Sequence, residues 1–137
     1  MLFYRVCHRD RTFGPPGEEV YAGPYNGHGI NSYRLRRMGW AHVDDGHPDV
    51  YEDVFARVLD HRPDIDPYDY VCGFAGPDDY RSWFYGYRSF LRHMGFVLRT
   101  YDVPSSAMFV GEKQAACYRG AIYKAELAGA YRTKVLR

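Results

Sequence analysis

Several features that often reveal a protein's class are scarce or missing in this sequence. Its only cysteines, Cys7, Cys72 and Cys117, are odd in number, widely spaced and without a Cys-x₂-Cys pair. This pattern argues against a disulfide framework and indicates buried, reduced thiols in a cytoplasmic protein. No apolar run reaches the roughly 20 residues of a membrane-spanning helix, and the N-terminus lacks the apolar stretch of a signal peptide. We therefore expect a cytoplasmic protein with no membrane partner.

The motifs of common enzyme families are missing as well. The sequence has no phosphate-binding P-loop, no Rossmann glycine pattern, no G-x-S-x-G and no HExxH. Cys7 and His8 are neighbours, but adjacent residues on a strand point to opposite faces, so they do not form a catalytic dyad. Acidic residues are so abundant between residues 44 and 79 that a pair of them identifies no site. A function has to be inferred from individual residues.

Tyrosine is abundant, and the charges are unevenly distributed. The 137 residues include 14 tyrosines, and tyrosine-rich surfaces are often interaction surfaces, although many of these rings must fill the core. Residues 41–80 carry two arginines and eleven acidic residues, whereas residues 81–137 carry ten basic and three acidic residues. Either the acidic segment faces a basic partner, or it packs beside the basic flanks, and both interpretations remain open.

Hydrophobic patterns predict a mixture of strands and helices. Apolar residues indicate strands at 2–8, 70–74 and 96–104. Apolar stripes at helical spacing indicate helices at 47–63 and 77–95, each with a proline near its start. A kink or break of the second helix at Gly86 is an open possibility. A shorter helix is expected from Asn31 to about Gly39.

The remaining segments complete the predicted architecture. A last strand in 115–123 is expected to lead into a C-terminal helix in 124–135. A chain of this length suits one domain with one core. We therefore predict a single α+β domain over residues 1–137, in which a small mixed or antiparallel sheet packs with two or three helices.

Two arginines fall within predicted strands and are candidate ligand-binding residues. Arg5 lies among inward-facing residues of the first strand, and Arg99 lies beside Val97 and Tyr101 on a later one. A buried cation needs a partner because its desolvation is costly. That partner is either an aspartate in a structural salt bridge or an anionic ligand, such as phosphate or a carboxylate, at the foot of a cleft.

The histidines between residues 27 and 49 are a poor match to a metal site. His42 and His47 are separated by four residues, with no cysteine nearby, whereas zinc sites prefer tighter pairs. We therefore predict no metal and a polar loop that leads into the helix opened by Pro48. His47 is retained as a candidate ligand-binding residue, although a hydrogen bond to the backbone ahead of that helix is its simplest role.

The predicted helix 77–95 also carries a basic face. Spacings of four, three and four residues place Arg81, Tyr85, Arg88 and Arg92 on one ridge. Such a ridge can contact phosphates and stack on a base, so a nucleic-acid partner is an alternative. An ordinary solvated helix face has the same appearance, and the overall charge is close to neutral.

Short segments distributed along most of the chain resemble small phage- and prophage-encoded proteins of unassigned function. The segments are FYR (3–5), GPY (23–25), HPDVYED (47–53), CGF (72–74), WF (83–84), GFVLRTYDVP (95–104) and GEKQ (111–114). The resemblance implies a viral or mobile-element origin and an accessory role in the cytoplasm of a bacterial host. It implies no particular chemistry, and a counter-defence role for the acidic segment is an analogy.

A fainter resemblance is to ADP-ribosyltransferases. It implies that Arg5, on the first strand, holds the pyrophosphate of NAD, and that Tyr25 or Tyr101 stacks on the nicotinamide. It also implies a catalytic glutamate near the start of a late strand, where this chain has Gln114, with Glu112 two residues before it. Because glutamine cannot supply a negative charge to the transition state, either Glu112 takes that role or the cleft only binds.

The function predicted first is that of a phage-type accessory protein without a cofactor. It would bind a host bacterial protein or a small, nucleotide-like anionic ligand. An NAD-dependent ADP-ribosyltransferase-like enzyme and a nucleic-acid-binding module are the alternatives.

Overall fold

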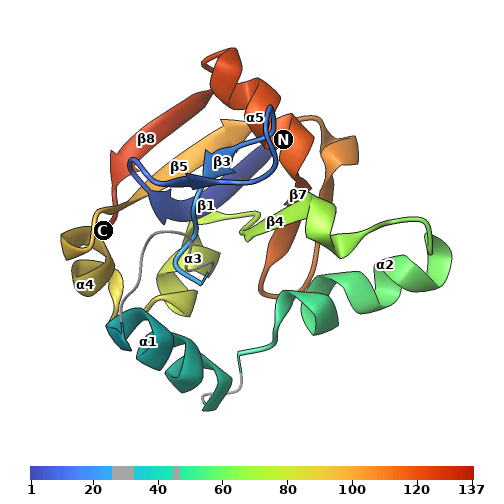
Figure 1. The fold of residues 1–137 in the computed structure, drawn as a ribbon. Helices are drawn as coiled ribbons and strands as arrows, with labels where there is room; N and C mark the ends of the chain where they lie inside the picture. The colour runs from blue at the N-terminus through green and yellow to red at the C-terminus, as the bar shows by residue number, and fades with distance from the viewer. Residues whose placement is uncertain (26–32, 45–46) are drawn as a thin grey trace.

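Two small antiparallel sheets form the centre of the molecule in a computed structural model that describes residues 1–25, 33–44 and 47–137 (Figure 1). The first sheet has the order β1–β5–β8, with strands Leu2–His8, Phe96–Asp102 and Tyr131–Val135. The second has the order β4–β7–β6, with strands Tyr70–Gly73, Ala115–Tyr118 and Met108–Val110. Backbone hydrogen bonds between Tyr4 and Phe74 connect β1 to the end of β4.

A short hairpin and several helices surround these sheets. The hairpin consists of β2 (Thr12–Phe13) and β3 (Val20–Tyr21). The α-helices of the described segments are α1 (Tyr33–Asp44), α2 (Ala56–His61), α3 (Pro77–Trp83), α4 (Arg88–His93) and α5 (Arg119–Leu127). A π-helical turn, Tyr51–Phe55, precedes α2, and 3₁₀ turns occupy Pro67–Asp69 and Ser105–Ala107. None of the helices in the described segments is long and apolar enough to cross a membrane.

Both faces of β1 are buried, which explains the apolar residues on both of its sides. Val6 packs in a cluster with Leu98 of β5, Leu91 of α4 and Met38 of α1. Phe3, from the opposite face, packs in a second cluster that includes residues of β7 and α5. Because side chains alternate along a strand, Arg5 shares the face of Phe3 and points between the two sheets.

The α+β prediction is confirmed, since helices are combined with sheets whose strand pairs are all antiparallel in the described chain. The predicted strands at 2–8, 70–74 and 96–104 correspond to β1, β4 and β5. The structure differs in having two small three-stranded sheets and, among the described segments, five α-helices in place of two or three. The short helix expected from Asn31 is α1, which continues past Gly39 to Asp44, while Asn31 itself lies outside the described residues.

The segment 77–95 contains the break at Gly86 that the sequence left open, so the alternative of a continuous helix is wrong. The segment forms two helices, α3 and α4, separated by a turn in which Gly86 adopts a φ of 84°. This left-handed conformation suits glycine and ends the regular helical hydrogen-bonding pattern. The apolar periodicity continues across the turn because both helices pack on the same cluster, through Trp83 and Leu91.

The predicted C-terminal helix is also wrong beyond residue 127. Helix α5 ends at Leu127, Gly129 adopts a φ of 67°, and the chain then returns as β8 beside β5. Tyr131 stacks on Tyr101 of β5 with ring centroids 5.6 Å apart. This pairing between strands distant in sequence outweighs the local helical propensity of the segment.

Candidate functional site

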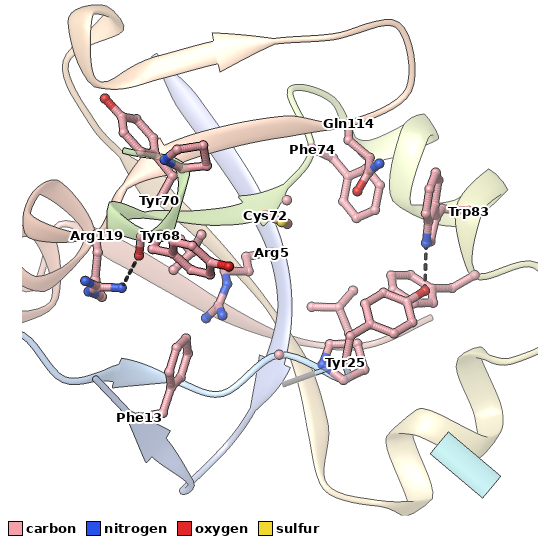
Figure 2. A pocket seen from close by; sticks show the side chains of 17 residues that line it. Arg5, Phe13, Tyr25, Tyr68, Tyr70, Cys72, Phe74, Trp83, Gln114 and Arg119 are labelled. Atoms are coloured by element: carbon pink, nitrogen blue, oxygen red, sulfur yellow. Dashed lines mark hydrogen bonds between the residues drawn. The ribbon is translucent and has the colours of Figure 1, made fainter. Parts of the chain in front are cut away.

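A cavity of about 260 Å³ lies where the two sheets, the β2–β3 hairpin and the end of α3 meet (Figure 2). We call it the Arg5 pocket. Its wall comprises residues of β1, the segment that follows β3, the stretch from Pro67 to Phe74, the end of α3, and Gln114 and Arg119 at the two ends of β7. Aromatic rings make up much of this wall, among them Phe13, Tyr25, Tyr68, Tyr70, Phe74 and Trp83. No aspartate or glutamate of the described residues lines it.

Arg5 is the buried cation of this pocket. Arg5 is only 3% exposed, which confirms the burial predicted from the sequence. The guanidinium Nη1 donates a hydrogen bond to the carbonyl of Tyr21, whereas Nε is buried without a hydrogen-bond partner. Within the described residues no carboxylate lies within 4.0 Å of Arg5, so the structural salt bridge considered from the sequence is not formed there. The positive charge is therefore not neutralised by a carboxylate in direct contact.

Arg99 lies directly opposite Arg5 in the β1–β5 register but has a different environment. It is 4% exposed, donates hydrogen bonds to the carbonyls of His8 (2.8 Å) and Arg9 (3.0 Å), and lies 3.5 Å from the centre of the Tyr21 ring. These contacts hold the chain that follows β1 and stack the guanidinium on an aromatic face. Arg99 does not line the pocket, so the two predicted ligand-binding arginines are not brought together there.

Glu126 on α5 is a negatively charged neighbour of both Arg5 and Arg99 at longer range. Glu126 accepts a hydrogen bond of 2.8 Å from the hydroxyl of Tyr101, which is fully buried outside the pocket lining. Burial raises the pKa of Glu126, while the Tyr101 hydrogen bond and the charges of Arg5 and Arg99 act in the opposite direction. Burial likewise raises the pKa of Tyr101. Tyr101 is therefore a core residue that reaches Glu126, away from the pocket surface.

Tyr25 forms a rigid aromatic wall of the pocket. Its hydroxyl accepts a hydrogen bond of 2.8 Å from Trp83 Nε1 and also contacts His42 Nδ1. Its ring stacks on Phe84, with centroids 6.1 Å apart and an interplanar angle of 23°. Desolvation raises the pKa of Tyr25 well above its ordinary value, so the side chain is a neutral hydrogen-bonding group. The residue remains 48% exposed. Tyr25 was a candidate ligand-binding residue from the sequence, and it lines the Arg5 pocket.

Gln114 also lines the pocket, but Glu112 does not. The Gln114 Nε2 donates to the carbonyl of Pro48 at 2.8 Å. The preceding turn is held by the Asp53 carboxylate, which accepts hydrogen bonds from the backbone N–H groups of Glu112, Lys113 and Gln114. Glu112 is exposed and lines a different surface depression beside Asp53. The structure thus brings Arg5, Tyr25 and Gln114 together and leaves Glu112 apart.

Cys72 is part of the pocket, although the sequence analysis treated it only as a buried thiol. That prediction holds for Cys7 and Cys117 and is wrong for Cys72, which is exposed. The side chain lines the cavity, so it is reachable by solvent while protein surrounds it on most sides. Desolvation raises the pKa of the Cys72 thiol to about 11, and the Arg5 charge opposes this shift. The thiol is therefore protonated near neutral pH.

Arg119 and Tyr68 are pocket residues that no sequence signal identified. Arg119 begins α5, and its Nη1 donates to the carbonyl of Tyr68 at 2.8 Å. Its Nη2 lies 3.8 Å from Asp69, and its Nε is buried without a hydrogen-bond partner. Tyr68 is 87% exposed on the Pro67–Asp69 turn, so its ring stands at the pocket mouth. Helix and strand periodicity cannot find such residues because they lie at turns and element ends.

The remaining predicted site residues lie elsewhere. His47 packs beside His42 and Trp83, with ring centroids 4.6 and 4.4 Å away, and does not line the Arg5 pocket. Its backbone N–H donates to the carbonyl of His42, and Pro48 follows it. Within the described residues there is no cluster of three or more His, Cys, Asp or Glu side chains suited to a metal ion.

The proposed basic ridge is divided by the turn at Gly86. Arg81 lies on α3, Tyr85 lies in the turn, and Arg88 and Arg92 lie on α4. Arg92 Nη1 donates to the carbonyl of Leu136 at 3.0 Å, and Arg81 lies 3.7 Å from Asp78. The four side chains therefore do not belong to one continuous helix, and nucleic-acid binding by this surface stays a prediction.

One comparison with known proteins identifies a relative of this chain. Residues 1–130 match the model of a family described as the bacteriophage T4 Y00F protein. Because this match covers nearly the whole chain, the chain belongs to the Y00F family, which confirms the predicted similarity to phage proteins. No curated protein and no solved structure matches the chain.

Proposed function

We propose that this member of the bacteriophage T4 Y00F family is an accessory protein of the infected bacterial cell and acts by binding a small anionic ligand in the Arg5 pocket. The burial of Arg5 in a concave pocket that no acidic residue of the described segments lines carries this proposal. A host protein is the other class of partner that the sequence predicts. A concave cavity lined by aromatic rings and a few polar groups is more typical of a small-molecule site.

The electrostatics of the pocket support an anion as the ligand. Removing a guanidinium from water costs several kcal/mol unless a partner compensates the charge. The Tyr21 carbonyl offers Arg5 one hydrogen bond but no negative charge. A phosphate or carboxylate would supply the charge and accept two hydrogen bonds from the planar guanidinium.

Calorimetric titration at low ionic strength tests this function directly. Inorganic phosphate, citrate and AMP are titrated into the wild type, the Arg5→Met variant and the Arg99→Met variant. We expect at least one anion to bind the wild type and Arg99→Met, and Arg5→Met to lose at least tenfold in affinity. Arg99 is the matched control because it is equally buried on the same sheet face but lies outside the pocket.

Protection of Cys72 provides a second readout that needs no variant. A bound anion should slow alkylation of the Cys72 thiol in the wild type because this thiol lines the same pocket. If none of the three anions binds or protects Cys72, or if a folded Arg5→Met variant binds as tightly as the wild type, the proposed function is wrong.

ADP-ribosyl transfer from NAD is a second candidate, favoured by the meeting of Arg5, Tyr25 and Gln114 on one pocket. Among the described residues the lining has no acidic side chain, which argues for binding over transfer because the transition state needs a nearby negative charge. Incubation with labelled NAD and bacterial lysate distinguishes the two. Nicotinamide release that Gln114→Ala abolishes and Glu112→Gln preserves would support transfer, and no release would reject it.

A further inference from the structure

The Arg5 pocket has two ends of different chemistry. In the view of Figure 2, the guanidinium groups of Arg5 and Arg119 lie on one side together with Tyr68, whereas Tyr25 and Trp83 lie on the other. Cys72 lies between these two groups of side chains. A ligand that fills the cavity would therefore meet cations at one end and aromatic faces at the other.

The cationic end is only weakly neutralised by the protein. Within the described residues, Arg5 and Arg119 each have a buried Nε with no hydrogen-bond partner, as does Arg99 outside the pocket. Asp69 is the only carboxylate within 4.0 Å of either guanidinium in the described chain, at 3.8 Å from Arg119, and its side chain is 52% exposed. Among these residues, Arg119 has only the half-solvated Asp69 as a nearby carboxylate, and Arg5 has only the more distant Glu126, which it shares with Arg99. This balance favours a dianionic ligand group over a monocarboxylate, which makes a phosphate monoester the best match.

The aromatic end presents a surface on which a flat ring can stack. The hydrogen bond from Trp83 fixes the Tyr25 hydroxyl, and stacking on Phe84 fixes its ring, although the residue is still 48% exposed. Because the ring is already ordered, stacking on it costs little conformational entropy. A base stacked on such a ring gains affinity without a specific hydrogen bond, because every base has a π face.

The size of the cavity limits the ligand to one nucleotide unit. Its volume of about 260 Å³ lies just below the roughly 300–1,000 Å³ that is usual for small-molecule pockets. A dinucleotide would fill the cavity with one half and leave the other half in solvent. The charged end, the aromatic end and the volume together describe a phosphate joined to one aromatic ring system.

We infer that the Arg5 pocket binds a nucleoside monophosphate, with the phosphate at Arg5 and Arg119 and the base against Tyr25. This inference rests on the proposed anion-binding function and names its ligand class. O-phosphotyrosine shares the same chemistry, a phosphate joined to an aromatic ring, but has no heterocyclic base. It therefore serves as a separate arm of the test.

The test compares ligands that lack one part of a nucleotide. AMP and UMP are titrated against adenosine, uridine, inorganic phosphate, O-phosphotyrosine and NAD. We expect a monophosphate to bind at least tenfold more tightly than its nucleoside and at least tenfold more tightly than phosphate. Arg119→Met and Tyr25→Ala should each weaken that monophosphate at least fivefold. Arg88→Met and Tyr85→Ala, at residues outside the pocket, should leave its affinity unchanged.

The outcomes separate this inference from the proposed function. If phosphate binds as tightly as both monophosphates, anion binding stands and the nucleotide assignment is overturned. Tighter binding of O-phosphotyrosine or NAD than of either monophosphate would also overturn the assignment. If no anion binds, both proposals fail. Should Tyr25→Ala not fold, the assignment is decided in the wild type, where UMP or AMP must protect Cys72 from alkylation at concentrations at which phosphate and nucleosides do not.

Discussion

Replacement of Asp53 by alanine should destabilise the protein, because one carboxylate holds a complete turn beside the pocket. Asp53 Oδ1 accepts a hydrogen bond of 2.8 Å from Glu112 N, and Oδ2 accepts bonds of 3.1 and 2.7 Å from Lys113 N and Gln114 N. No other side chain of the described residues accepts these three N–H groups. The variant would leave them to water or without partners.

The expected magnitude follows from the number and exposure of these bonds. Hydrogen bonds to charged groups contribute about 1.5–3 kcal/mol each. Asp53 is only partly buried, so we take about 1 kcal/mol for each of the three bonds. Asp53→Ala should therefore lower the free energy of unfolding by about 3 kcal/mol. For a domain of this size, that corresponds to a fall in Tm of about 9–15 °C.

Urea denaturation followed by tryptophan fluorescence or circular dichroism measures this loss. Asp60→Ala is the matched control, since Asp60 is an exposed acid of α2 whose side chain makes no hydrogen bond or ion pair to any described residue. The control should change the free energy of unfolding by less than about 0.5 kcal/mol. If Asp53→Ala loses less than about 1 kcal/mol, the turn does not depend on this carboxylate and the reasoning is refuted.

Three further predictions concern single residues. With a pKa of about 11 in place of 9, Cys72 should be alkylated at pH 8 roughly a hundredfold more slowly than an ordinary exposed thiol, and faster as the pH rises; an ordinary rate at pH 8 would contradict this. Gly73→Ala should lower the free energy of unfolding, measured by urea denaturation, by about 2–4 kcal/mol, because the added Cβ would lie 2.5 Å from the Tyr4 carbonyl oxygen. Gly76→Ala is the control, because a Cβ there would meet nothing closer than 3.5 Å. Burial raises the pKa of Glu126 in the folded state above its ordinary value of 4.5. The protonated side chain therefore stabilises the fold fully below pH 4.5, and this stabilisation is lost as the pH rises through the raised pKa. Glu126→Gln should remove this loss, and an unchanged pH profile of unfolding would argue against it.

The fold class and the central strands could be predicted because they depend on local patterns. Apolar residues on both sides of the predicted strand 2–8 indicated a strand buried on both faces, and with it the burial of Arg5. The breaks in the pattern were harder to place. Periodicity alone could not decide between a continuous helix and a break at Gly86, since the residues on both sides pack on one cluster. Strand β8 was missed because its pairing with β5 is a contact between segments distant in sequence.

The pocket could be predicted only in part. Arg5, Tyr25 and Gln114 were selected as single residues, and the structure brings them to one cavity. The sequence analysis missed Arg119, Tyr68 and Cys72 for a shared reason. Each lines the pocket only because the folded chain brings distant segments together around it. Arg119 faces the cavity because α5 begins immediately after β7, and its hydrogen bond to the Tyr68 carbonyl joins segments 51 residues apart.

The contrast between the two opposed arginines shows why a charge on a buried strand does not by itself specify a function. Arg5 and Arg99 share one sheet face and the same degree of burial. Arg99 donates to two main-chain carbonyls and stacks on the Tyr21 ring, so its terminal nitrogens are used within the fold although its Nε, in the described residues, has no hydrogen-bond partner. Arg5 donates to one carbonyl and lies at the wall of a cavity, which Arg99 does not. The sequence could indicate that both would be buried, but only the packed structure distinguishes a structural cation from one available to a ligand.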